Sequence, residues 1–585
     1  MMKLEYGSDI AAQILSNLDI DYVALNPGAS FRGLHESIVN YGGNKKPEVI
    51  LCCHEEIAVS IAQGYAKAAG KPMAAAVHNV VGLLHSSMAI FNVWVDKTPV
   101  LVIGGTGPMA VEKRRPWIDW IHTALVQGNV VRDYVKWDDQ PTSIDSMVES
   151  FHRGFRAAVS EPKGPVYICL DSDLQEQRIN ENYALPDPAR FPIPTSPQAD
   201  PKAIQEVARL LVHAEKPVVI ADCMARNDQS FASLVELAEL LSLPVIDSYP
   251  MSGRLNFPSI HPLDLSGDGA KIIPGADVIL GLDISDFGLH LNDIDRNTGV
   301  QRSLISETTK VIHIGLNELL LRSWSQSIGR LQPMHLSITA EASLALPALI
   351  ASCREEMKKG NPVDRKERFA RLKARHDALR KEWQEKAAQA RKEKPVAVPH
   401  LAAELWELVR NEDWVLVNGT LMGWTRQLWD WTKPYQWLGF GGGAGLGQGI
   451  SCAIGGALAL KGTGRLCIDI QPDGDLLFTP SALWTAAHHQ IPLLVVVVNN
   501  RSYYNSENIQ GQIAKARGRS TATQGIGTKI DHPAVDYAAL ARSFGLYGEG
   551  PIDDPEKVRP ALERAIRHVK ENGSCALVDV LTQPR

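Results

Sequence analysis

The segment formed by residues 441–504 constrains the fold of this 585-residue chain more than any other segment. It opens with GGGAGLGQG, a glycine-dense loop that runs into a helix of small residues, and such loops bring the backbone close to a phosphate. Two buried strands follow at 465–470 and 491–498, with a helix between them. This order predicts two neighbouring parallel strands in an α/β sheet.

Polar residues stand directly after both strands, where ligands bind in open α/β sheets. Asp473-Gly474 follows the first strand and Asn499-Asn500 follows the second, which brings a carboxylate and an amide oxygen to one sheet edge. Oxygen ligands beside a phosphate-binding loop suit Mg²⁺ and a diphosphate. The segment therefore predicts a magnesium and diphosphate site.

The composition excludes several classes of protein. The 60 basic and 66 acidic residues give no reason to expect a nucleic acid or an acidic membrane surface as partner. The eight cysteines lack metal-ligand spacing, and Cys52-Cys53 are adjacent, a poor geometry for a disulfide. The first residues, MMKLEYGSDIAAQIL, have no apolar core of signal-peptide length, and no apolar run reaches the ~20 residues of a membrane span. We expect a cytoplasmic protein.

Strands alternate with helices through most of the chain, which predicts an α/β protein with three doubly wound parallel sheets. A proline-rich stretch and a highly charged stretch separate the three parts. We predict that the charged stretch is a solvent-exposed connecting helix. The predicted units are a first domain (1–185), a linker (186–200), a middle domain (201–350), the charged helical linker (351–394) and the magnesium-binding domain (395–585).

The Asp-Gly pair and the Asn-Asn pair, one helix and one strand apart, resemble the signature of thiamine diphosphate (ThDP) dependent enzymes. The resemblance implies that Asp473, Asn500 and the backbone carbonyl of Ser502 bind Mg²⁺. The family usually has Gly-Asp-Gly at the first pair. Here Pro472 precedes Asp473, so the turn lacks one N–H donor.

The segment HEEIAVSIAQGYAKA is similar to the one that carries the cofactor-activating glutamate of these enzymes, which assigns that role to Glu55. A carboxylate bonded to the aminopyrimidine ring of ThDP favours the imino tautomer, whose nitrogen deprotonates the thiazolium carbon. Leu446 lies where the family uses a bulky apolar side chain to bend ThDP. Further cofactor contacts are implied for Asn26, Pro27, Gly28, Thr420, Ala444, Gly474 and Asp475.

Within the family the benzoylformate-decarboxylase-like branch is most similar, through SALWTAAHHQIPLLVVVVNN and through the NPG motif at 26–28. By this resemblance His78 is one catalytic histidine and His290 is a candidate for the other, both suited to relay protons. One departure concerns the serine that follows NPG in that branch, because Ala29 stands there and Ser30 comes next. Glu507, seven residues after Asn500, is a candidate for an additional acid–base group.

Several reactions on a small-molecule substrate stay open. His78 and His290 favour a 2-oxo acid decarboxylase. Glu507, the basic run 113–115 and the cluster of Lys515, Arg517 and Arg519 favour a 2-hydroxyacyl-coenzyme A lyase, because basic side chains bind phosphates. An acetolactate-synthase-like carboligase is a third reading, and the middle domain could hold FAD, ADP or nothing. A catalytically silent subunit would need neither Glu55 nor the metal ligands.

The resemblance also has a consequence for assembly. It implies that Glu55 and the magnesium ligands act on one ThDP from different subunits. Helices of small residues at 61–70 and 450–460 are compatible with close packing across a two-fold axis. We predict an obligate homodimer, which is doubled into a homotetramer.

Overall fold

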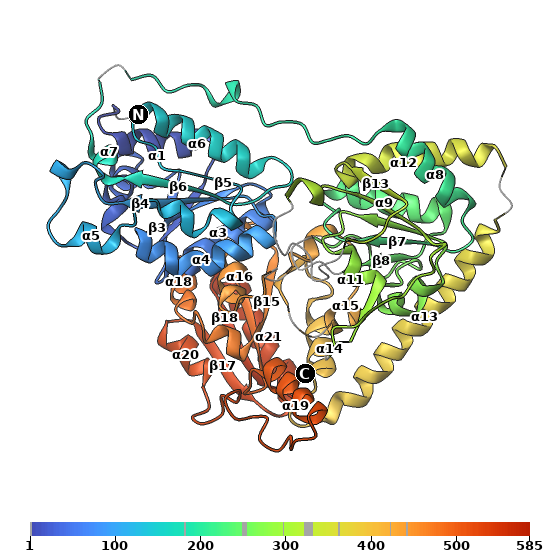
Figure 1. Ribbon diagram of the computed structural model, residues 1–585. Helices are drawn as coiled ribbons and strands as arrows, with labels where there is room; N and C mark the ends of the chain where they lie inside the picture. Colours follow the sequence, from blue (N-terminus) through green and yellow to red (C-terminus); the bar gives the residue numbers. More distant parts are fainter. Residues whose placement is uncertain are drawn as a thin grey trace.

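Three parallel β-sheets follow one another along the chain. In Figure 1 the first sheet lies above the third, and the second stands beside them both. The structure is a computed structural model, which describes residues 3–180, 183–248, 254–295, 298–320, 331–360, 363–419, 421, 423–439 and 443–584.

The first sheet has the strand order β2-β1-β3-β4-β6-β5, and all neighbouring strands are parallel. Successive residues of β3 belong to different hydrophobic clusters, Ala74 and Ala76 to one and Ala75 and Val77 to the other, so the strand is buried on both faces. The strands are β1 (Tyr22–Leu25), β2 (Glu48–Leu51), β3 (Met73–Val77), β4 (Val100–Thr106), β5 (Trp137–Asp139) and β6 (Val166–Asp171). The helices are α1 (Gly7–Asn17), α2 (Arg32–Glu36), α3 (Glu55–Ala69), α4 (Val80–Val95), α5 (Ile118–His122), α6 (Ile144–Val159) and α7 (Ser172–Glu176).

The second sheet is also parallel, with the order β13-β12-β9-β7-β8. Its strands are β7 (Pro217–Ala221), β8 (Val245–Asp247), β9 (Val278–Leu282), β12 (Lys310–Gly315) and β13 (Leu336–Thr339), and its helices are α8 (Pro201–His213), α9 (Asp228–Leu241), α10 (Gly269–Ile272), α11 (Phe287–Leu291) and α12 (Ala342–Lys358). A small antiparallel hairpin of β10 (Asn292–Ile294) and β11 (Gln301–Ser303) lies beside it. The sequence did not predict the hairpin or β13, because these strands are short and carry polar residues.

The third sheet has the order β14-β15-β16-β18-β17, so the two strands that carry the predicted metal ligands are neighbours. Its strands are β14 (Trp414–Asn418), β15 (Leu466–Pro472), β16 (Leu494–Asn499), β17 (Tyr547–Ile552) and β18 (Ala576–Leu581). Its helices are α14 (Val398–Val409), α15 (Trp424–Leu428), α16 (Gln448–Ala459), α17 (Asp473–Leu476), α18 (Ala482–His488), α19 (Tyr504–Ala516), α20 (Tyr537–Ser543) and α21 (Pro555–Asn572).

Two connections join the three parts. An extended chain with one short turn at Pro188–Arg190 crosses the upper edge of the molecule in Figure 1. Helix α13 (Arg365–Gln389) runs down its right side toward α14. The prediction that this charged helix is solvent-exposed is wrong for one face: Arg368 is buried and donates to the carbonyl of Leu241 at 2.7 Å, and His376 Nδ1 lies 2.9 Å from the carbonyl of Asp264.

Helices α3 and α16 pack tightly against each other, and glycines make this possible. A Cβ atom on Gly64 would lie 1.8 Å from the carbonyl oxygen of Cys452, and one on Gly455 would lie 2.0 Å from the carbonyl oxygen of Ile61. These are the small-residue helices that the sequence suggested for a subunit interface. Their small faces are buried against each other within one chain, so the close packing joins the first and third domains of the same chain. Their part in a subunit interface stays a prediction.

The prediction of three parallel α/β sheets is confirmed. Among the described residues, no helix combines the length and the apolarity that crossing a lipid bilayer requires. All eight cysteines carry free thiols.

Candidate active site

The predicted metal ligands lie at adjacent strand ends. Pro472 of β15 pairs with Val498 of β16, so Asp473 and Asn500 follow neighbouring strands at the same sheet edge. Asp473 is only 2% exposed, and its Oδ1 accepts the N–H of Gly474 at 2.9 Å. Tyr537 Oη donates to the carbonyl of Asp473 at 3.0 Å. These two hydrogen bonds hold the turn in place, although Pro472 has no N–H to donate.

The loop after β16 is held in a defined conformation. The Oδ1 atom of Asn500 accepts the N–H of Ser502 at 3.0 Å, and Arg501 between them has a left-handed backbone with φ 55°. Ser502 Oγ donates to Glu507 Oε2 at 2.6 Å, and both residues are buried. In this geometry Glu507 anchors the predicted metal loop, so its carboxylate is engaged rather than free to act on a substrate.

The glycine loop before α16 is tied to β15 and α17. Asp475 Oδ1 accepts the N–H of Gly447 at 2.7 Å, and its Oδ2 accepts Gln471 Nε2 at 2.5 Å. The predicted cofactor contact of Asp475 is therefore indirect, through the position of the loop. Ala444 has a φ of 51°, a left-handed conformation that a residue with a side chain adopts only under constraint. Leu446 is 41% exposed beside it.

Two further predicted contacts complete this part of the site. A Cβ atom on Gly474 would lie 2.5 Å from the ring of Tyr503, whose Oη donates to the carbonyl of Gly474 at 3.3 Å. Only glycine therefore lets the Asp473 turn and the Ser502 loop pack together. The predicted contact Thr420 lies outside the described residues, as do residues 440–442 of the glycine loop.

Glu55 begins α3 and is only 6% exposed. A Cβ atom on Gly82 of α4 would lie 3.0 Å from its Oε1, so the glycine leaves room for the carboxylate. His85, also on α4, places Nδ1 at 3.4 Å from Oε2. His54 caps α3 by accepting the N–H of Glu56 and stacks on His85, with ring centroids 5.0 Å apart. Glu55 is thus a buried carboxylate surrounded by imidazoles.

The next residue, Glu56, was not singled out in the sequence. Burial and the nearby charge of Asp475 raise the pKa of Glu56 to about 7. A Cβ atom on Gly447 would lie 3.4 Å from Glu56 Oε1. Glu56, at the start of α3, therefore lies next to the glycine loop of the same chain.

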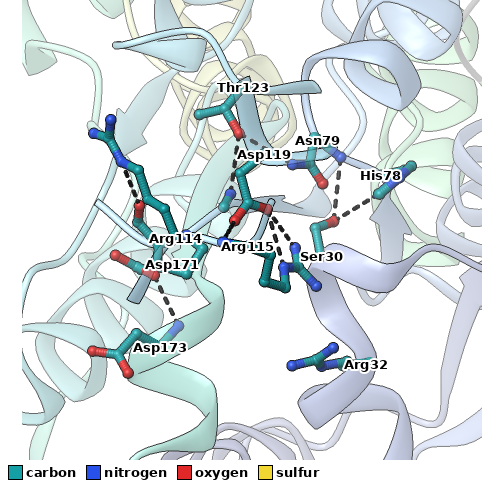
Figure 2. A network of polar contacts seen from close by, with 12 residues as sticks. Ser30, Arg32, His78, Asn79, Arg114, Arg115, Asp119, Thr123, Asp171 and Asp173 are labelled. Carbon is teal, nitrogen blue, oxygen red and sulfur yellow. Dashed lines mark hydrogen bonds and ion pairs between the residues drawn. The ribbon is translucent and has the colours of Figure 1, made fainter. Parts of the chain in front are cut away.

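The NPG motif lies directly beside His78, and Figure 2 shows His78 with Ser30, which follows the motif. A Cβ atom on Gly28 would lie 2.7 Å from Cγ of the His78 ring, so this position needs glycine. Asn26 Nδ2 donates to the carbonyl of Cys52 at 3.0 Å, which ties the motif to β2. Ser30 Oγ lies 2.9 Å from His78 Nδ1 and is fully buried. The hydroxyl that the sequence showed to be shifted by one position is thus present, but it is committed to the histidine.

His290, the second predicted histidine, ends α11 in the middle domain. Burial lowers its pKa, and the charges of Asp222 and Asp286 oppose this effect. Among the described residues, no hydrogen bond or ring contact joins His290 to His78. The histidine that does contact His78 is His122 of α5, with ring centroids 5.3 Å apart, and the sequence analysis missed it. The sequence gives little indication of this contact, because a single histidine at the end of a helix is common.

The basic run at 113–115 is largely engaged within its own domain. Arg114 donates to the carbonyls of Pro108 and Met109, and Arg115 forms an ion pair of 2.7 Å with Asp119 (Figure 2). These contacts weaken the reading of the run as a phosphate site. The second predicted basic group is exposed on and after α19 and consists of Lys515, Arg517 and Arg519.

The donor set fits the predicted groups unevenly. The carboxylate of Asp473, the amide of Asn500 and the carbonyl of Ser502 are hard oxygen donors at one sheet edge, as Mg²⁺ requires. In the middle domain the strand order reverses between β7 and β9, which is where a nucleotide would bind. Asp222 and Asp283 follow these two strands as buried carboxylates, and the guanidinium of Arg226 lies 3.3 Å from Asp283. FAD or ADP at this place stays a prediction.

Family models match the chain in three successive parts. The N-terminal TPP binding domain of thiamine pyrophosphate enzymes matches residues 6–128, the central domain matches 204–349 and the C-terminal TPP binding domain matches 418–580. Acetolactate synthase 1, chloroplastic, from Oryza sativa subsp. japonica is 25% identical over 585 residues, which cover 96% of this chain and 82% of that protein.

Two crystal structures share the fold along the whole chain. Benzoylformate decarboxylase from Polynucleobacter necessarius superimposes with a TM-score of 0.77 at 19% identity, covering 100% of this chain and 99% of that one. The thiamine diphosphate-dependent 4-hydroxybenzoylformate decarboxylase of Rhodococcus jostii gives a TM-score of 0.75 at 19% identity, covering 99% of each chain. At these identities the similarity concerns the fold alone.

Proposed function

Because the chain belongs to the thiamine pyrophosphate-dependent enzyme family, we propose that it is a Mg²⁺-dependent lyase that decarboxylates a 2-oxo acid to an aldehyde and CO₂. The observation that carries the choice of reaction is the contact between Ser30 and His78 beside the NPG motif. It fixes an imidazole next to a buried glutamate, as a reaction that consumes one proton per turnover requires.

ThDP, when bound, supplies the nucleophilic carbon and accepts the electron pair of the broken bond. Asp473, Asn500 and the carbonyl of Ser502 would hold the Mg²⁺ that binds its diphosphate. Glu55 would bond the pyrimidine ring through its buried carboxylate, which lies 3.4 Å from Nδ1 of His85. His78 would deliver a proton to the product, since Ser30 holds the ring in one orientation.

A carboligase of the acetolactate synthase type is the second candidate, favoured by the sequence relatives named above. It shares the decarboxylation step and differs in the acceptor of the activated carbon. The 2-hydroxyacyl-coenzyme A lyase reading is weaker, because Glu507 is bonded to Ser502 and Arg115 to Asp119.

We further propose that the enzyme works as a homodimer or a homotetramer. Five large apolar side chains are 37–56% exposed along α4 and beside the glycine loop, where they would be covered by a second copy. They are Leu84, Met88, Phe91, Leu446 and Phe478.

A substrate screen tests the proposed reaction. The protein, loaded with ThDP and Mg²⁺, is incubated with benzoylformate, pyruvate and a 2-hydroxyacyl-coenzyme A, and CO₂, aldehydes and acetolactate are measured. We expect equal amounts of CO₂ and aldehyde from at least one 2-oxo acid, and none from the Glu55→Gln variant. Acetolactate as the main product would favour the carboligase. Carbon–carbon cleavage of the 2-hydroxyacyl-coenzyme A, without reaction of either 2-oxo acid, would contradict both proposals.

A further inference from the structure

Ser30 and Asn79 form a small polar network beside His78 (Figure 2), and the ring of His122 contacts the ring of His78. The two rings meet edge to face, with centroids 5.3 Å apart and an interplanar angle of 85°. The Nδ1 atom of His122 is buried and has no hydrogen-bond partner within the described part of the chain. Burying an imidazole nitrogen without a hydrogen-bond partner costs free energy of folding. Its presence beside a second histidine therefore points to a functional role.

Ser30 occupies one nitrogen of the His78 ring. Its Oγ accepts the N–H of Asn79 at 3.3 Å and lies 2.9 Å from His78 Nδ1. A hydroxyl has one donor and two acceptor lone pairs, so this contact suits either neutral tautomer of His78. In both tautomers Nδ1 is bonded to Ser30, and Nε2 is the atom left for proton transfer.

The surroundings of His78 lower its pKa. Burial lowers the pKa most, the charge of His122 lowers it further, Glu55 opposes this and Arg115 adds to it. These are the charged groups that face His78, from α3, from α5 and from the segment before α5. Like charges in contact repel, so a proton on one ring disfavours a proton on the other.

The segment that carries His122 is held in place on both sides. Arg115 bonds Asp119 through its backbone N–H and its guanidinium, at 2.5 and 2.7 Å. Thr123 Oγ1 accepts the N–H of Gly107 at 3.2 Å and lies 3.4 Å from Asn79 Nδ2. The contact with His78 is thus built into the loop and does not depend on a free side chain folding back.

We infer that His122 is a second acid–base residue, which shares one proton with His78 and supplies it to the product. The inference rests on the proposed decarboxylation. In that reaction the bond between the carboxylate and the carbonyl carbon breaks, CO₂ leaves, and the freed electron pair forms a C–H bond with a proton. The proton comes from the imidazolium of the pair, which becomes neutral and takes up a new proton from water.

The first test is independent of any substrate. The protein is labelled with [¹³Cε1]histidine, and the signals of His78 and His122 are assigned from His78→Gln and His122→Gln and followed over pH by NMR. Because the charge of His122 lowers the pKa of His78, we expect this pKa to rise in His122→Gln. His35→Gln, a histidine on α2 of the same domain, serves as the control and should leave the titration of His78 unchanged. An unchanged pKa of His78 in His122→Gln would overturn the pairing.

The second test uses the 2-oxo acid found in the screen. His122→Leu should lower kcat about 100-fold, the lower range for loss of an acid–base group, and added imidazole should restore part of it. Deuterium exchange at the thiazolium carbon of bound ThDP should stay at the wild-type rate, because Glu55 is intact. Absent exchange in the wild type would count against the proposed function instead. Wild-type turnover by His122→Leu would refute the role of His122.

Discussion

Carboxylates of the same type have different tasks around this site, and their neighbours decide which. Asp475 and Glu507 already accept hydrogen bonds from the loops that they hold. Asp473 and Glu55 are buried where the resemblance places a cation and a cofactor ring. Asp475 and Glu507 thus hold loops in place, whereas the roles of Asp473 toward the metal and of Glu55 toward the cofactor stay predictions.

Asp473→Ala should abolish Mg²⁺-dependent binding of ThDP, because the diphosphate loses the charged ligand that holds its counter-ion. Isothermal titration calorimetry with ThDP, in Mg²⁺ and in a chelator, measures this. Asp475→Asn is the comparison, since an amide can still accept the N–H of Gly447. Unchanged ThDP affinity in Asp473→Ala would place the metal elsewhere.

Asp579→Asn should stabilise the protein above neutral pH. Burial raises the pKa of Asp579 to about 7, while the hydrogen bond from Asn499 opposes the shift. The folded chain therefore binds this proton more tightly than the unfolded chain. Its stability falls as the pH rises from about 4 to about 7 and stays low above, by on the order of 2–4 kcal/mol. Melting curves should show the gain at pH 8 and its loss near pH 4, whereas a gain independent of pH would contradict this cause.

At the scale of elements, the crossing of α3 and α16 predicts a sharp difference between two adjacent glycines. Gly455→Ala would place Cβ 2.0 Å from the carbonyl of Ile61, and we expect it to destabilise the fold by about 3 kcal/mol or more. In Gly456→Ala the nearest atom is Val417 Cγ1 at 3.1 Å, a side chain that can shift. Thermal unfolding of both variants measures the difference, and equal melting temperatures would refute the close crossing.

The elements that the sequence predicted well are those whose pattern is local. Buried strands such as β15 and β16 are continuous apolar runs, and their order along the chain fixes them as neighbours. The short strands β10, β11 and β13 have no such run. The face of α13 that is buried through Arg368 and His376 was missed, because its contacts are made with residues more than 100 positions away.

The same distinction holds for the site. Glu55, Asp473 and Asn500 were chosen from residue type and spacing, and their roles stay predictions. The contact of His122 with His78 and the bond of Glu507 to Ser502 depend on how loops fold back, which spacing does not encode.

At the scale of the whole molecule, α4 and the residues beside the glycine loop carry exposed apolar side chains. If two chains share each site there, inactive Glu55→Gln and inactive Asp473→Ala chains should complement each other. Mixed, dissociated and reassociated, they should form hybrid dimers with one wild-type site out of two. Activity of the mixture measures this, and no recovery at all would mean that each site is built within one chain.

The account rests on Glu55 as the group that activates bound ThDP, and the exchange of the thiazolium hydrogen in D₂O measures that activation directly. The protein is saturated with ThDP and Mg²⁺, the reaction is quenched with acid at short times, and proton NMR follows the loss of the signal. Wild-type protein should exchange this hydrogen orders of magnitude faster than Glu55→Gln, which keeps the shape of the side chain and should still bind ThDP. Equal exchange rates in the two proteins, with ThDP bound to both, would contradict the account.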